Sequence, residues 1–147
     1  MEYVIGIALA IASIGSAAAI GLARDRSFYS TIMIWTASNY VLFALMGGSR
    51  HTLILESLLA AGFIAAAVIG FKTNLWIVVA ALVGHGLFDF VHHQLVANPG
   101  VPHWWPGFCL AFDVVAGGLL AFFLSTHHRF SVAPTSGANR GARSQPQ

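Results

Sequence analysis

The chain has few charged residues: Asp, Glu, Lys and Arg together make up 8% of its 147 residues, whereas a typical soluble domain has about 25%. Apolar residues instead make up 57%. A small soluble globule has too little interior to bury that much apolar surface, but a lipid bilayer accepts it. The shortage of charge therefore excludes an ordinary soluble domain and predicts an integral membrane protein.

Cysteine is nearly absent. Cys109 is the single cysteine, so the chain has neither an internal disulfide framework nor a CxxC pair for zinc or redox chemistry. Basic residues are also few and scattered, without the basic patch that is typical of nucleic-acid-binding proteins. We therefore expect no nucleic-acid partner, and membrane lipid as the main partner.

Long apolar runs are what the sequence has in abundance. Crossing a bilayer takes about 20 mostly apolar residues, and five stretches satisfy this requirement, with short polar breaks between them. We expect an all-α integral membrane protein: a transmembrane bundle over residues 1–126, followed by a disordered tail over 127–147 that is rich in Ser, Gly, Ala, Arg and Pro. The five expected spans are 3–23, 28–46, 52–71, 75–95 and 107–125.

The basic residues indicate how these helices are oriented. With the N-terminus outside and the C-terminus inside, only Arg50 lies in an outer segment, which agrees with the positive-inside rule. The tail is then cytoplasmic. The chain begins Met-Glu-Tyr rather than with a basic segment, so we expect an uncleaved first span rather than a signal peptide. The basic residues on the cytoplasmic side are Arg24, Arg26, Lys72, Arg129, Arg140 and Arg143.

Three acidic residues fall inside expected spans, where a lone charge costs about 2.5–3.5 kcal/mol at mid-bilayer. They are Glu56, Asp89 and Asp113, on the third, fourth and fifth spans. With a rise of about 1.5 Å per residue, these acids and Asn39 of the second span all lie about 6–10 Å below the outer ends of their helices. Polar groups from four helices therefore share one level in the outer half of the bundle, and they need one another, a cation or water.

The stretch GHGLFDFVHHQL adds histidines to that level. His85, Asp89 and His92 are spaced i, i+4, i+7 and share one helix face, and His93 is also four residues from Asp89. Imidazole and carboxylate groups on adjacent helices are ligands for zinc, iron or manganese, and helical bundles build metal sites in this way. We expect a divalent metal, zinc first and iron or manganese as alternatives, held by ligands from His85, Asp89, His92, His93 and Asp113.

The motif H-x3-D-x2-H-H that begins at His85, the Asn-Pro pair at 98–99 and the C-x3-D motif at 109–113 resemble a family of small bacterial multi-pass membrane proteins of unknown function. The resemblance covers about residues 50–120 and includes Glu56 as the acid one helix earlier. It implies a multi-pass protein of a bacterial inner membrane and implies no established activity.

The outer loop departs from that family, because this chain has the run H-W-W-P at 103–106 and a single cysteine. The resemblance therefore implies no redox role for Cys109. In chemistry alone, the His and Asp pattern is similar to that of zinc-dependent membrane hydrolases of the alkaline ceramidase type, which have more helices and a different order of motifs.

These residues support two classes of function. A metal-dependent hydrolase of a lipid or amphiphile would use Glu56 or Asp113 as general base for a metal-bound water. The alternative is a non-enzymatic protein that handles a metal or protons, or an accessory subunit in which the same residues form a structural polar network. The sequence does not decide which of His92 and His93 faces inward, and it leaves a homo-oligomer open.

Overall fold

The chain folds into a bundle of long helices, and the structure, a computed structural model, describes residues 1–130, with side chains described for 1–126. No strand occurs among these residues, and five helices are long and apolar enough to cross a membrane. The all-helical architecture and the five long apolar helices expected from the sequence are confirmed. The elements are α1 (Glu2–Ala19), the 3-10 helix η1 (Leu22–Arg24), α2 (Arg26–Gly47), α3 (Arg50–Lys72), α4 (Leu75–Leu95) and α5 (Trp105–Phe130).

The expected disordered tail is described only at its start. Residues 127–130 continue α5, whereas residues 131–147 lie outside the described residues. The expected first span also differs from the observed helix, because α1 ends at Ala19 rather than at Ala23. Gly21 adopts a φ of 83°, a left-handed conformation that only glycine takes without steric cost. That residue ends α1 and turns the chain into η1.

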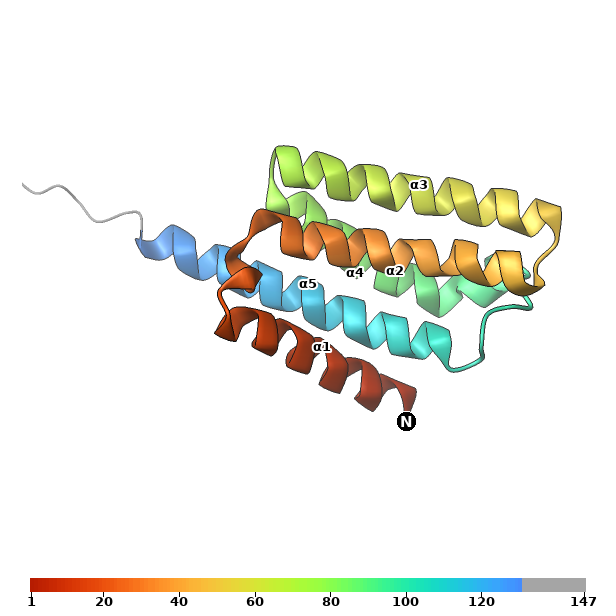
Figure 1. Ribbon diagram of the computed structural model, residues 1–147, viewed down its shortest axis with the longest axis horizontal. Helices are drawn as coiled ribbons and strands as arrows, with labels where there is room; N and C mark the ends of the chain where they lie inside the picture. The colour runs from red at the N-terminus through yellow and green to blue at the C-terminus, as the bar shows by residue number, and fades with distance from the viewer. Residues whose placement is uncertain (131–147) are drawn as a thin grey trace, which may run out of the picture.

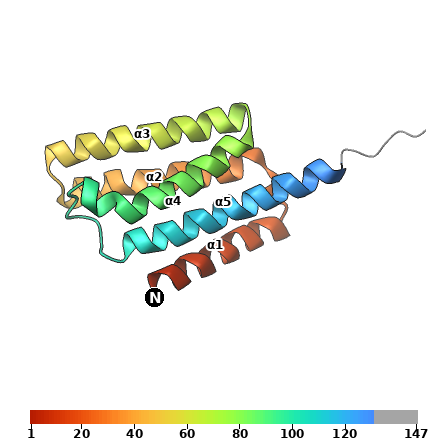
Figure 2. The ribbon, with the colours of Figure 1, turned by 180° about the vertical axis from the view of Figure 1, so that it is seen from behind.

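The helices lie side by side (Figures 1 and 2). α5 packs between α1 and α4, and α3 packs on α2 and α4. The interior is filled by apolar side chains such as Met33, Val78 and Leu82, which are fully buried. Many large apolar side chains instead lie on the outside, among them Leu58 at 66% and Phe122 at 62% exposure. A bundle whose outer surface is apolar is suited to lipid rather than to water.

Side-chain caps fix where the helices begin. The Asp25 carboxylate accepts hydrogen bonds from the backbone N–H of Ser27 and from its hydroxyl, both at 2.8 Å, and so caps α2. These bonds stabilise the charged form and hold the pKa of Asp25 below its usual value of 3.8. Ser49 and Asn74 cap α3 and α4 in the same way.

The two ends of the bundle carry different connections. The α2–α3 turn and the longer loop between α4 and α5 lie at one end, together with the N-terminus (Figure 1). The 3-10 helix η1 and the α3–α4 turn lie at the other end. We call the first the loop end and the second the basic end, after Arg24, Arg26 and Lys72.

Candidate metal centre

Three ionisable side chains meet between α4 and α5 near the loop end. His85 and Asp89 lie one turn apart on α4, and Asp113 faces them from α5. His85 Nδ1 lies 2.7 Å from Asp113 Oδ2 and 3.4 Å from Asp89 Oδ2. One ligand atom of each residue lies within 4.8 Å of the others. The side chains are almost completely buried, with exposures of 2% for His85 and 0% for both acids.

Gly86 allows α4 and α5 to approach closely at this point. A Cβ atom there would lie 3.1 Å from the carbonyl oxygen of Leu110 and 3.4 Å from the Cβ atom of Asp113. Such spacing is too tight for a side chain to enter without moving the α5 backbone. The absence of a side chain next to His85 therefore brings Asp113 within reach of α4.

Asp89 is buried without hydrogen bonds. Neither of its carboxylate oxygens has a partner among the described residues, nor does Oδ1 of Asp113. The Tyr40 hydroxyl lies near Asp89 but forms no hydrogen bond of regular geometry with it. Unpartnered buried carboxylate oxygens are costly and call for an explanation. A divalent cation would satisfy them, because carboxylate oxygen and imidazole nitrogen are its usual ligands.

A second polar pair lies beside the first group. Glu56 Oε1 lies 2.8 Å from His92 Nε2 and accepts a hydrogen bond of 2.8 Å from Asn98 Nδ2. Asn98 also donates to the carbonyl oxygen of Tyr40 at 3.2 Å, and the His92 ring packs on the Tyr40 ring with centroids 4.2 Å apart. These contacts tie the α4–α5 loop to α2 and α3, and they turn His92 into the bundle.

A small cavity separates the two groups. It has a volume of about 10 Å³ and is lined by residues that include Tyr40, Glu56, Phe63 and His85. That volume is roughly the space that one water molecule occupies. Glu56 and His85 therefore both line a cavity at the lower limit of the size that one water molecule needs.

A larger pocket opens at the loop end. It has a volume of about 720 Å³, and His92 and Asn98 form part of its wall, together with the apolar side chains of Phe90, Val96 and Leu110. His92 and Asn98 are also the two partners of Glu56. The pocket therefore reaches the polar interior through residues that contact Glu56 directly.

The structure brings together most of the residues that the sequence singled out. His85, Asp89 and Asp113 form the first group, and Glu56 and His92 form the second. His93 is exposed and lines the larger pocket, outside the group of potential ligands.

The structure does not bring Asn39, which was expected at the level of the acids, into either polar group. Its side chain donates to the carbonyl oxygen of Trp35 in its own helix, and the neighbouring Tyr40 is buried near the two polar groups instead. Asn98 was missed as a partner of Glu56, because nothing in its local sequence shows that a loop residue reaches a helix 42 residues away.

Neither a protein-family model nor a curated protein nor a solved structure matches this chain. The functional assignment therefore rests on the residues of the site. The resemblance to a bacterial membrane family stays a prediction.

Proposed function

We propose that His85, Asp89 and Asp113 bind one divalent metal ion, zinc first, and that the protein uses it to hydrolyse a lipid or another amphiphile. The observation that carries the proposal is Asp89, a fully buried carboxylate whose oxygens form no hydrogen bond with any described residue and which lies beside two further potential ligands. Three protein ligands leave a fourth position for water, which is the arrangement of catalytic zinc sites. Bound zinc makes such a water nucleophilic at neutral pH.

The Glu56–His92 pair supplies acid–base chemistry in this proposal. Glu56 borders the small cavity that also touches His85, so it is the carboxylate placed to take a proton from a water there. His92 Nε2 lies 2.8 Å from Glu56 and would hold that proton for a leaving group. We assign Asp113 to metal binding rather than to general-base chemistry, because it already contacts His85 at 2.7 Å.

The larger pocket supports an amphiphilic substrate. Its volume of about 720 Å³ lies within the range of about 300–1,000 Å³ that small-molecule sites have. Its wall combines apolar side chains with the polar groups of His92 and Asn98. With the orientation indicated by the basic residues, this pocket would face the outer leaflet of a bacterial inner membrane.

Metal content of the detergent-purified protein tests the proposal. We expect about one equivalent of zinc, iron or manganese in the wild type, which Asp89→Ala would lose. His93→Ala is the matched control, because His93 lies on the same helix but is exposed, and it should keep the metal. Wild-type protein that is folded, free of metal and unable to bind added zinc would contradict the proposal.

A polar network without metal is the second candidate. The 2.7 Å contact between His85 and Asp113 favours it, because this pair is satisfied without an ion. The network gives Asp89 only the 3.4 Å contact of its Oδ2 with His85 Nδ1 and no hydrogen bond to any described residue. The metal proposal therefore accounts for more of the buried polar atoms.

A further inference from the structure

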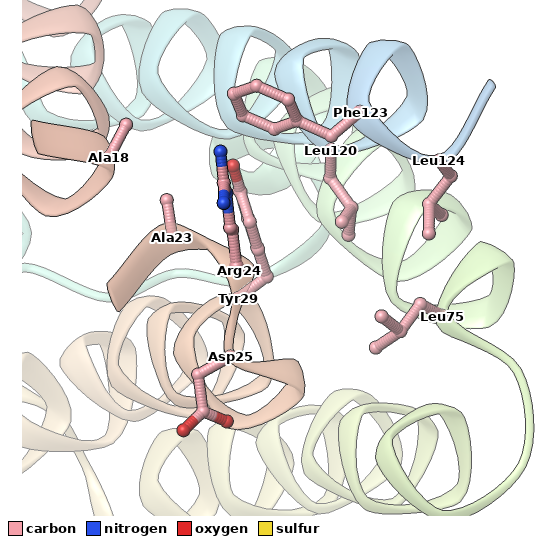
Figure 3. A pocket seen from close by; sticks show the side chains of 9 residues that line it. All are labelled: Ala18, Ala23, Arg24, Asp25, Tyr29, Leu75, Leu120, Phe123 and Leu124. Atoms are coloured by element: carbon pink, nitrogen blue, oxygen red, sulfur yellow. The ribbon is translucent and has the colours of Figure 1, made fainter. Parts of the chain in front are cut away.

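We propose that a pocket at the basic end of the bundle binds one anionic phospholipid, with its phosphate at Arg24 and Tyr29 and an acyl chain on α4 and α5. The pocket has a volume of about 370 Å³ and lies where η1 joins α1 to α2 (Figure 3). It is at the opposite end of the bundle from the metal centre, and the proposal does not depend on that centre. The lining residues are Ala18, Ala23, Arg24, Asp25, Tyr29, Leu75, Leu120, Phe123 and Leu124.

Arg24 brings an uncompensated positive charge to this pocket. Its side chain forms no ion pair and no hydrogen bond with any residue in the described part of the chain. Arg26, two residues later, is used differently, because it donates to the carbonyl oxygens of Phe71 and Thr73 at the end of α3. The nearby Asp25 is occupied as the cap of α2 and points away from Arg24 in Figure 3. Arg24 therefore remains free to bind an anion.

Tyr29 supplies a second, independent indication of a ligand. Its side chain is 1% exposed, and its hydroxyl has no hydrogen-bond partner among the described residues. In Figure 3 the hydroxyl and the Arg24 guanidinium point toward the same part of the pocket. A buried hydroxyl normally has a partner. A phosphate oxygen would accept hydrogen bonds from both groups, and those from arginine would be charge-assisted.

The rest of the wall determines which kind of anion fits. Leu75 of α4 and Leu120, Phe123 and Leu124 of α5 form an apolar surface beside the two polar groups. A free phosphate ion would gain nothing from this surface, whereas an acyl chain would bury against it. Basic residues near a membrane surface also attract anionic lipids, and Arg24, Arg26 and Lys72 lie at this end. These features together favour an anionic phospholipid.

Native mass spectrometry of the full chain, with dioleoylphosphatidylglycerol or dioleoylphosphatidylcholine added to the detergent, tests the assignment. We expect the wild type to keep one molecule of the anionic lipid. Arg24→Gln should weaken this binding about tenfold. Arg50→Gln removes the same charge from an exposed residue at the loop end and should leave binding unchanged.

Tyr29→Phe separates lipid binding from folding. Removing a buried hydroxyl that has no partner should not lower the thermal stability of the lipid-free protein. The same change should weaken binding of the anionic lipid, because one donor to the phosphate is lost.

Several outcomes would overturn the proposal: no anionic lipid kept by the wild type, equal retention of both lipids, or equal binding by Arg24→Gln and wild type. Inorganic phosphate that raises the melting temperature as much as the anionic lipid would point to a simple anion site instead. A second copy of the chain bound in place of the lipid would assign the pocket to an interface.

Discussion

At the residue scale, Glu56 holds the loop end of the bundle together. One of its oxygens serves both the His92 ring on α4 and the Asn98 amide in the α4–α5 loop. All three side chains are buried in the folded protein. Without Glu56, His92 Nε2 would lose its partner and the Asn98 amide would keep only its bond to the Tyr40 carbonyl oxygen.

Glu56→Ala should therefore lower the free energy of unfolding by about 2–4 kcal/mol. The measurement is an unfolding titration with SDS in mixed micelles. Ser57→Ala is the control at the next position, because Ser57 is exposed and bonds only to the carbonyl oxygen of Leu53 in its own helix, and its effect should stay within about 0.5 kcal/mol. Equal stability of Glu56→Ala and wild type would show that the hydrogen bonds seen here contribute nothing.

Helical spacing predicted some of the residues of this site. The other residues could not be predicted in this way, because spacing along one helix does not show how that helix is rotated in the bundle. The i, i+4, i+7 spacing placed His85, Asp89 and His92 on one face, and all three are indeed buried. Helical spacing did not show that Tyr40 rather than Asn39 faces the polar groups, because neighbouring residues differ by about 100° around a helix and the rotation of α2 depends on tertiary packing. The same limit applied to His92 and His93.

At the element scale, the lengths of the apolar runs predict where the helices lie in the sequence, but they do not predict which helices contact each other. Five apolar runs predicted five helices, and the structure has five helices able to cross a membrane. The end of α1 depended on one glycine in a left-handed conformation. The close approach of α4 to α5 at Gly86 is a tertiary contact, which hydropathy does not report.

Gly86→Val tests whether that close approach builds the metal centre. The added side chain would collide with the α5 backbone near Leu110 and push Asp113 away from His85, at a cost of about 1–3 kcal/mol. We expect bound metal to be lost. Gly84→Val is the matched control on the same helix, because a Cβ atom there meets nothing within 4 Å; metal retained equally by both variants would refute this role of Gly86.

The cap of α2 predicts a dependence of stability on pH. Because the pKa of Asp25 is lower in the folded state than its usual 3.8, the charged cap stabilises the fold above that pH. The contribution is lost as the pH falls through the folded-state value. Asp25→Asn keeps a capping oxygen that does not titrate. Its melting temperature should therefore fall less than that of the wild type between about pH 5 and pH 3, and parallel curves would contradict the prediction.

At the scale of the whole molecule, the two ends of the bundle differ in chemistry. The loop end has the buried acids, the histidines and the larger pocket. The other end has the pocket of about 370 Å³ and Arg24, which pairs with no residue in the described part of the chain. The uneven distribution of basic residues predicts that the loop end faces outward.

Labelling of single cysteines on intact cells tests this orientation. In a Cys109→Ala background, a cysteine at His103 should react with a membrane-impermeant maleimide, whereas one at Lys72 should react only after the cells are opened. Both positions are exposed in the fold, so access to the reagent depends on the side of the membrane. The reverse pattern would place the metal centre in the inner half of the bilayer.

The most direct test of the metal centre is X-ray absorption at the zinc edge, measured on purified protein loaded with one equivalent of zinc. We expect a shell of nitrogen and oxygen ligands at about 2.0–2.1 Å with the scattering pattern of a single imidazole, and loss of that pattern in His85→Ala. A spectrum of hydrated zinc without an imidazole, or one that does not change in His85→Ala, would contradict a metal centre at His85, Asp89 and Asp113.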